Sequence, residues 1–257
     1  MRARSSNRAP PSTSSPTRAR NAPSCSSARS SSPDMTDLSG VRALTFDVFG
    51  TVVDWRSSVS AEVAAFLSRH GVDADAGMFT DRWRREGYAG GMRLVRDGEL
   101  PFQTADQLHH RMLKILLEEL GIEAEQAEVE ELNRAWHRLH PWIDSPGGLQ
   151  RLRSRFMVST LSNGNVDLLV NMAKFGALPW DCVLSAQITG AFKPEPQCYQ
   201  RAAELLGCES HEVMMVAAHQ GDLLAAARTG MRTAFVPRPD EAGPNFPVGR
   251  PPAPAFA

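Results

Sequence analysis

The sequence predicts an α/β fold, in which helices cover a parallel sheet and a helical lobe is inserted after the first strand. Short apolar segments with strand character alternate with amphipathic helical segments after residue 150. Before that point, four helical segments follow the first strand with no further strand between them. The composition of the 257 residues, 42% hydrophobic and 22% charged, is that of a globular protein and excludes a wholly disordered, collagen-like or coiled-coil chain.

The first part of the predicted body contains one strand and the four helices. Residues 41–47 form a short β-rich run that ends in an acid and is followed by Gly50 and Thr51. Apolar residues then recur at helical spacing, and glycine or proline ends several of the segments. The predicted helices cover residues 57–70, 78–96, 102–120 and 124–139.

The second part alternates regularly between strands and helices. Strand–helix–strand connections of this kind place neighbouring strands parallel, with the helices as crossovers. The predicted strands cover residues 156–161, 181–185, 213–217 and 232–236. The predicted helices between them cover residues 165–175, 196–206 and 222–229.

These elements predict a core domain from residues 39–54 and 145–238, with a helical cap domain at 55–144 between its two parts. Both ends of the chain lack such periodicity. Residues 1–38 are rich in serine, arginine and proline and are predicted to be a disordered extension, with Met35 as an alternative natural start. An organellar transit peptide is a weaker reading, because prolines interrupt the helix such peptides use. Residues 239–257 are predicted to be a proline-rich irregular tail.

Charge and cysteine usage exclude several functional classes. The formal net charge of −1 gives no overall attraction to nucleic acid or to an anionic membrane. No run of 18 apolar residues is present, so the sequence predicts no membrane span. The four cysteines form no C-x-x-C pair, which favours free thiols in a reducing compartment and predicts a cytoplasmic location.

Polar residues follow the predicted strands at their carboxyl ends, where open α/β sheets bind ligands. Each of them taken singly has an ordinary structural explanation, such as a turn, a helix cap or a solvated side chain. Their combination in one chain order favours a catalytic site. The candidates are Asp47, Thr51, Ser162, Asn163, Lys193, His219 and Asp222.

The same residues carry a resemblance to a known family. The segments 47–51, 162–164, 193–194 and 216–222 resemble the four motifs of the haloacid dehalogenase superfamily, over essentially residues 41–240. The context of the second motif, Tyr199 six residues after the lysine, and Trp83-Arg84 in the helical lobe resemble the L-2-haloacid dehalogenases in particular. The resemblance implies a Rossmann-like core with an inserted helical cap and hydrolysis through an aspartyl ester.

Two positions favour the dehalogenase branch over the magnesium phosphatases of the superfamily. The phosphatases have a second acid two residues after the nucleophile, which protonates the leaving alkoxide, and this chain has Phe49 there. They also have an acid four residues before the position of Asp222, and this chain has Ala218. A hard divalent cation therefore lacks two carboxylates, and we expect no metal and no cofactor. A departing halide needs no general acid.

The resemblance and the chemistry together assign expected roles. Asp47 attacks the halogen-bearing carbon of a 2-haloacid, and water then cleaves the ester at the Asp47 carbonyl to give a 2-hydroxy acid with inverted configuration. Asp222 orients or deprotonates that water, and Lys193 balances the two acids. Ser162 and the amides after Asp47 hold the substrate carboxylate, on a turn that includes Thr51. The expected halide contacts are Arg84 and Asn163, with Arg85 as a rival, and Tyr199 and His219 complete the expected substrate-binding set.

Some positions depart from the dehalogenase pattern. Phe49 stands where tyrosine is frequent, Ala217 replaces a serine, His219 an asparagine and Gly221 a tryptophan. His219 is read as a satisfied polar residue, with a role as a second base left open. The expected partners are a small 2-haloacid and water, without nucleic acid or membrane, and a homodimer is left open. Two other classes also remain: a phosphatase with unusual metal ligation, and a non-catalytic binding module of the same superfamily.

Overall fold

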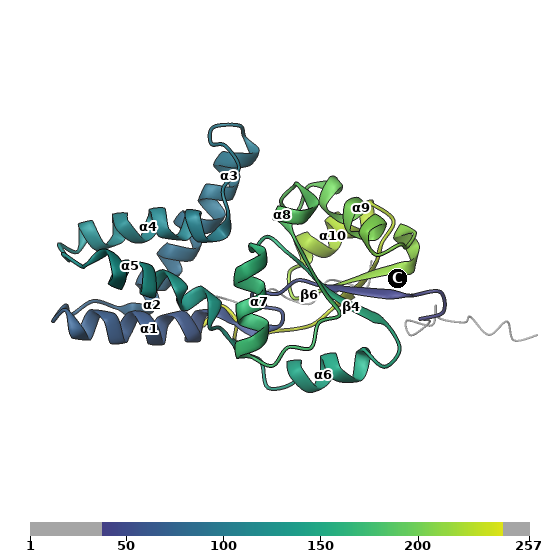
Figure 1. Cartoon of the computed structure of the whole chain (residues 1–257), viewed down its shortest axis with the longest axis horizontal. Helices are drawn as coiled ribbons and strands as arrows, with labels where there is room; N and C mark the ends of the chain where they lie inside the picture. Colours follow the sequence, from purple (N-terminus) through teal and green to yellow (C-terminus); the bar gives the residue numbers. More distant parts are fainter. Residues whose placement is uncertain (1–37, 244–257) are drawn as a thin grey trace, which may run out of the picture. The chain divides into compact units, whose positions relative to one another are not determined.

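The computed structural model describes residues 38–243, and the predictions for the rest of the N-terminal extension and of the C-terminal tail lie outside these residues. Its centre is a five-stranded parallel sheet in the order β5-β4-β1-β6-β7. Figure 1 labels β4 and β6 of this sheet. The first strand in the sequence, β1, is the central strand of the sheet. The next two, β4 and β5, lie on one side of β1, and the last two, β6 and β7, lie on the other side. The strands are β1 (Ala43–Phe46), β4 (Met157–Ser162), β5 (Cys182–Ser185), β6 (Val213–Ala217) and β7 (Arg232–Phe235).

Alternation along the strands divides the core into two parts, one on each face of the sheet. Leu44 and Phe46 of β1 belong to the core that includes helices α6 (Ser145–Leu152) and α7 (Val166–Phe175). Ala43, one residue away, belongs to the core that includes α9 (Pro196–Leu205) and α10 (Gln220–Arg228). Successive side chains point to opposite faces of a strand, so a buried central strand must supply both cores.

The predicted helical insertion follows β1 directly and is built from helices that lie beside one another (Figure 1). Thr104 begins α4 with a capping box to Gln107, which fixes the start of that helix. A two-stranded antiparallel ribbon, β2 (Val53–Asp54) with β3 (His140–Pro141), joins the two ends of the insertion. The division into a core and a cap at residues 55–144 stays a prediction. The helices are α1 (Trp55–Arg69), α2 (Ala76–Arg82), α3 (Gly90–Arg96), α4 (Ala105–Glu119) and α5 (Gln126–Asn133).

The helix predicted at 78–96 contains a segment of π-helix, η1 (Trp83–Ala89), between α2 and α3. Such segments widen the helix locally and are frequent at functional sites. Trp83 is fully buried, donates from Nε1 to the His109 carbonyl oxygen at 2.8 Å, and packs edge-on against Trp136. The π-helix therefore starts on a rigid aromatic core.

A polar cluster links the insertion to helix α7, and we name its four members, Asp106, His137, Asn165 and Asp167, the interlobe cluster. Asp106, at the start of α4, pairs with His137 Nε2 at 3.1 Å and accepts a hydrogen bond from Asn165 Nδ2 at 2.8 Å. Asn165 Nδ2 also donates to Asp167. His137 Nδ1 accepts from Asn171 Nδ2 at 3.0 Å, which leaves the proton of the neutral ring on Nε2, facing Asp106.

The elements that were not predicted include α6, the four-residue α8 (Ala186–Thr189) and the β2–β3 ribbon. Helix α6 contains Pro146, Gly147 and Gly148, which are poor helix formers, and it forms because Leu149 is buried in the core. The other two elements are too short for any periodicity to show. Among residues 38–243, no helix combines the length and the apolar character needed to cross a bilayer.

Candidate active site

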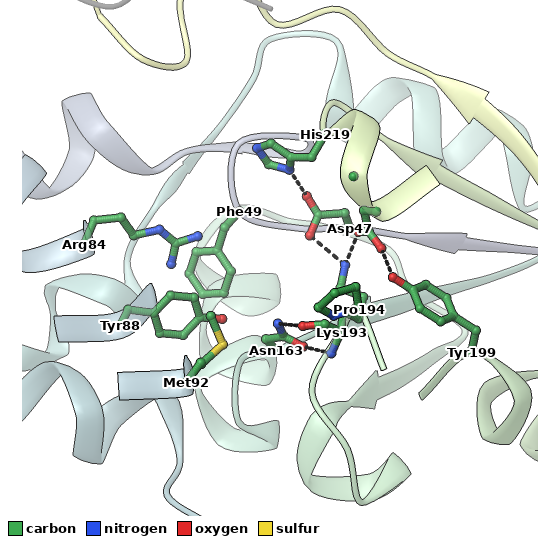
Figure 2. Close-up of a pocket in the computed structure, with 12 residues that line it drawn as sticks. Asp47, Phe49, Arg84, Tyr88, Met92, Asn163, Lys193, Pro194, Tyr199 and His219 are labelled. Atoms are coloured by element: carbon green, nitrogen blue, oxygen red, sulfur yellow. Dashed lines mark hydrogen bonds and ion pairs between the residues drawn. The ribbon is translucent and has the colours of Figure 1, made fainter. Parts of the chain in front are cut away.

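A cavity of about 320 Å³ borders the carboxyl ends of the central strands. Its wall combines residues that follow β1 and β6 with residues of η1 and α3 from the insertion (Figure 2). The size suits a small molecule, since ligand cavities begin at about 300 Å³. The lining residues are Asp47, Phe49, Arg84, Tyr88, Met92, Asn163, Lys193, Pro194, Tyr199, His219, Gly221 and Asp222.

Asp47 follows β1, and a tight turn holds its carboxylate. Gly50 has φ +85°, a conformation that side chains disfavour, and so lets the chain reverse directly after Phe49. The reversal brings the Thr51 hydroxyl to Asp47, to which it donates at 2.8 Å on Oδ2. The Ala218 amide donates to the Thr51 oxygen at 2.9 Å, which ties the turn after β1 to the turn after β6.

Lys193 lies between the two predicted acids and contacts both. Its Nζ donates to Asp47 Oδ1 at 2.9 Å and to Asp222 Oδ2, and Tyr199 donates its hydroxyl to Asp222 Oδ1. Burial lowers the pKa of Lys193, but the charges of Asp222 and Asp47 outweigh burial and hold that pKa above its usual value. The ammonium therefore stays charged between two carboxylates.

Asn163 fixes the backbone at Lys193. Its Oδ1 accepts from the Lys193 amide at 2.7 Å, and its Nδ2 donates to the Lys193 carbonyl oxygen at 3.0 Å. The loop after β4 thus sets the position of the loop that carries the lysine. Asn163 also lines the cavity, where the sequence prediction places it.

The electrostatic surroundings keep Asp47 ionised. Burial raises the pKa of its carboxyl, but the Lys193 charge and the hydrogen bond and charge of His219 hold this pKa well below the usual range. Asp47 is 8% exposed, so little water screens these interactions. A charged carboxylate that is buried beside a cavity is suited to nucleophilic attack.

His219 joins the site through both ring nitrogens. Its Nδ1 lies 2.9 Å from Asp47 Oδ2, and its Nε2 lies 2.8 Å from Glu241 Oε1 (Figure 2 draws the first contact). Burial lowers the pKa of His219, but hydrogen bonds to Asp47 and Glu241 and their charges outweigh burial and raise it to about 10. The imidazole is therefore protonated at neutral pH in this state.

Glu241 was not predicted as a site residue, because it falls in the segment assigned to the irregular tail. A turn holds it in place: the Glu241 amide donates to the Arg238 carbonyl oxygen at 3.2 Å, and Arg238 Nε donates to the Thr51 carbonyl oxygen at 2.8 Å. A Cβ at Gly50 would lie 1.9 Å from Glu241 Oε1, so the glycine leaves room for this carboxylate. The sequence carries no local signal for such a contact.

Arg84 lines the cavity on the side of the insertion, beside Tyr88 and Met92 (Figure 2). Its guanidinium carbon lies 4.2 Å from the Tyr88 ring centre and 4.7 Å from that of Phe49, at cation–π distance. Its Nη1 is buried without a hydrogen-bond partner among the described residues. The predicted rival, Arg85, is 64% exposed at its side chain and pairs with Glu86, so Arg84 is the arginine that reaches the cavity.

Two predicted substrate-binding residues do not line the cavity. Ser162 is fully buried, and its hydroxyl accepts from the Gly164 amide at 3.1 Å, which shapes the turn after β4. Thr51 is also buried and bonds Asp47. Direct substrate contacts by these two stay predictions. Phe49, Tyr88 and Met92 line the cavity and were not predicted to bind substrate.

The side chains around Asp47 offer few ligands for a divalent cation. Phe49 is buried against Tyr88 and Trp136, with ring centres 5.9 and 6.4 Å away, and supplies no oxygen. The Lys193 ammonium already lies between the carboxylates of Asp47 and Asp222. Magnesium needs several oxygen ligands in near-octahedral geometry, so this arrangement does not favour it.

Comparisons with known proteins agree with this geometry. The chain is 30% identical over 206 residues to (S)-2-haloacid dehalogenase 4A of Burkholderia cepacia, covering 78% of this chain and 85% of that protein. A solved structure of a defluorinating L-2-haloacid dehalogenase is 44% identical, with a TM-score of 0.77 over 82% of this chain and 89% of that one. The L-2-haloacid dehalogenase of Xanthobacter autotrophicus with covalently bound chloropropionic acid is 25% identical, with a TM-score of 0.66 over 76% and 77% of the two chains. A family model described as haloacid dehalogenase-like hydrolase matches residues 41–230, and the chain belongs to this family.

Proposed function

We propose that this protein hydrolyses short L-2-haloalkanoic acids to 2-hydroxy acids through an ester on Asp47. One observation carries the proposal: an ionised, buried carboxylate faces a small cavity, and Phe49 stands where a phosphatase has its proton donor. Carbon–halogen cleavage needs a nucleophile and a site for the halide, and it needs no acid to protonate the leaving group. The relatives whose names specify 2-haloacids support the same substrate class.

The cavity provides groups for the reacting carbon and for the halide of such a substrate. Asp47 attacks the carbon that carries the halogen, and the carbon inverts as the halide departs. Arg84, with an unpartnered N–H group and an aromatic environment, stabilises the departing halide by charge and hydrogen bonding. Lys193 holds Asp47 in place, and Asn163 holds the lysine loop.

Halide release from a panel of 2-fluoro-, 2-chloro- and 2-bromoacids tests the proposal. We expect the wild type to release halide from the L enantiomers and Asp47→Asn to lose at least about 10⁴-fold in rate, because the amide cannot form the ester. The matched control is Asp73→Asn on an exposed residue, which should keep full activity. A wild type that is inactive on the whole panel, or an active Asp47→Asn variant, would overturn the proposal.

The source of the product oxygen distinguishes an ester from direct attack by water. In a single turnover in H₂¹⁸O with enzyme in excess, an ester route gives unlabelled hydroxy acid and places ¹⁸O in the Asp47 side chain. Mass spectrometry of the product and of the peptide that contains Asp47 reads both outcomes. Label in the first-turnover product would instead show that water attacks the substrate directly.

Location and assembly stay predictions. The described cysteines, Cys182, Cys198 and Cys208, are free thiols, which agrees with the expected reducing compartment. We place the enzyme in the cytoplasm on this basis, and fractionation of cells would test it. A homodimer stays open, and sedimentation equilibrium would test it.

A further inference from the structure

Three side chains of the described region hydrogen-bond the Asp47 carboxylate: Lys193, Thr51 and His219. They differ in their ability to take a proton. The Lys193 ammonium has no free lone pair, and a hydroxyl such as that of Thr51 is a very weak base. A neutral imidazole can take a proton at neutral pH. His219 is therefore the suitable base in direct contact with the group that becomes the ester.

Asp222, the acid expected to activate water, has a different set of contacts. Its Oδ2 accepts from Lys193 and its Oδ1 accepts from the Tyr199 hydroxyl. These hydrogen bonds hold the lysine that contacts Asp47. The geometry thus gives Asp222 a positioning role and leaves the base at His219.

Glu241 orients the His219 ring. Its carboxylate lies 2.8 Å from Nε2, which keeps a proton on that nitrogen and leaves Nδ1 facing Asp47 Oδ2. Trp55 Nε1 also donates to Glu241 Oε1, at 3.2 Å, so a second donor holds the carboxylate. An acid, a histidine and a nucleophile in a row follow the same logic as a catalytic triad, in which the acid fixes the tautomer and orientation of the base.

We propose that His219, oriented by Glu241, is the base that activates the water for hydrolysis of the Asp47 ester. The inference rests on the proposed function and replaces the role expected for Asp222. His219 is a catalytic residue in this scheme because it touches the reacting carboxyl, and Glu241 is a positioning residue. The His219 side chain is 43% exposed and borders the cavity, so water has access to it.

The proton balance closes over one cycle. When Asp47 attacks the substrate, a neutral ester forms and the negative charge departs on the halide. His219 then has no charged partner at Nδ1 and releases the Nδ1 proton to solvent. Water then adds to the ester carbonyl and gives one proton to Nδ1. His219 returns that proton to the leaving alkoxide as the bond between Cγ and the substrate oxygen breaks. The second water proton passes from the regenerated carboxyl to Nδ1, which restores the ion pair.

The charged groups around His219 make this cycle workable. Asp47 and Glu241 contact the ring, and Lys193 and Asp222 line the same cavity. With Asp47 ionised, the pKa of His219 is raised to about 10 and the ring is not a base. Esterification removes one of the two carboxylate charges in contact with the ring, so its pKa falls and the ring can accept a proton at the time it is needed.

The main test is His219→Asn with L-2-chloropropionate, because asparagine keeps a hydrogen-bond donor but cannot accept the proton. We expect a burst of one chloride per enzyme, and then an ester that mass spectrometry detects on Asp47 and that breaks down about 10²–10⁴-fold more slowly than in the wild type. The matched control is His211→Asn at an exposed position. Asp222→Asn should slow ester formation as well, because it disturbs Lys193.

The outcomes separate this inference from the proposed function. If the wild type releases no chloride, both fail. If His219→Asn forms the ester and hydrolyses it at the wild-type rate, only this inference fails. If the ester persists in Asp222→Asn and not in His219→Asn, Asp222 is the base.

Glu241→Gln provides a second variant, which keeps a hydrogen-bonding side chain and removes one charge. We expect the midpoint of the pH profile of the ester-hydrolysis rate to move to lower pH, because an imidazole without its acid partner has a lower pKa. Asp240→Asn, at an exposed position on the same turn, is the control. A rate that falls with an unchanged pH midpoint would show that Glu241 acts on structure alone and would overturn its part of the inference.

Discussion

Two polar clusters in this protein combine carboxylates with a histidine, and they differ in what surrounds them. One is the interlobe cluster, and the other, the catalytic cluster, consists of Asp47, Lys193, His219, Asp222 and Glu241. In the interlobe cluster, His137 has 10% of its side chain exposed and pairs with Asp106 and Asn171. In the catalytic cluster, His219 has 43% of its side chain exposed, borders the cavity, and pairs with two carboxylates. None of the four members of the interlobe cluster lines that cavity.

The difference shows which features turn a histidine–carboxylate pair into a chemical site. The interlobe cluster satisfies its polar groups internally: the Asn165 amide donates to both Asp106 and Asp167 and lies where a bound cation would have to be. One possible ligand atom each from Asp106, His137 and Asp167 lies within 4.8 Å of the others, a spacing that metal ligands also have. The catalytic cluster instead directs charged groups at open space, so a substrate can exchange places with water there.

The largest expected effect is that of Lys193→Met, which should damage both stability and activity. Removal of the ammonium leaves Asp47 and Asp222 buried without their shared partner, which costs about 3–5 kcal/mol in free energy of unfolding. Halide release should fall by at least about 10²-fold. Urea unfolding and halide assays measure the two effects, and Lys174→Met, at an exposed position, is the control. An unchanged unfolding free energy would refute the buried-pair account.

Asp106→Asn should affect stability and leave the chemistry nearly unchanged. In the variant an NH₂ donor replaces one of the two carboxylate oxygens that contact His137 and Asn165, which costs about 1–3 kcal/mol. The rates of ester formation and hydrolysis should stay within a few-fold of the wild type. Urea unfolding and single-turnover kinetics measure these quantities. A large loss of rate in a protein of normal stability would erase the distinction between the two clusters.

The sequence predicted the parts of the molecule that depend on short-range patterns. The strands and Asp47, Lys193 and Asp222 follow from apolar runs that end in polar residues, because parallel strands bring their carboxyl ends to one edge. The π-helix at 83–89 could not be predicted, because the spacing of its apolar residues does not distinguish it from an α-helix. Glu241 could not be predicted because its position depends on contacts between residues far apart in sequence: its own contacts with Trp55 and His219, and the hydrogen bond from Arg238 to the Thr51 carbonyl oxygen.

A smaller effect concerns the pH dependence of stability. The pKa of His219 is raised from its ordinary value of about 6.5 to about 10 in the folded protein. Its ion pairs therefore stabilise the folded state fully below about pH 6.5, and this contribution is lost as the pH rises through about 10. The difference in unfolding free energy between wild type and His219→Asn should therefore narrow from pH 6 to pH 10. Urea titrations across that range measure it. A difference that is constant or widens would show that the imidazole is neutral in the resting enzyme.

The smallest expected effect is that of metal removal. Phe49 and Ala218 stand where carboxylates would be needed, and Lys193 already balances the two acids. EDTA should leave halide release unchanged, and added Mg²⁺ should not stimulate it. If EDTA abolished halide release and Mg²⁺ restored it, the site around Asp47 would use a metal ion in spite of Phe49 and Ala218. The dehalogenase interpretation of these two positions would then be wrong.

The turn that follows the last described strand determines where the protein can be shortened without loss of a site residue. A domain boundary drawn from secondary structure would fall shortly after β7 ends at Phe235, and a chain shortened to Arg238 keeps every described strand and helix. Such a chain would lack Glu241, the partner of His219. A boundary placed at the end of the sheet, in a shortened protein or in a comparison of related sequences, therefore leaves out the carboxylate that contacts His219.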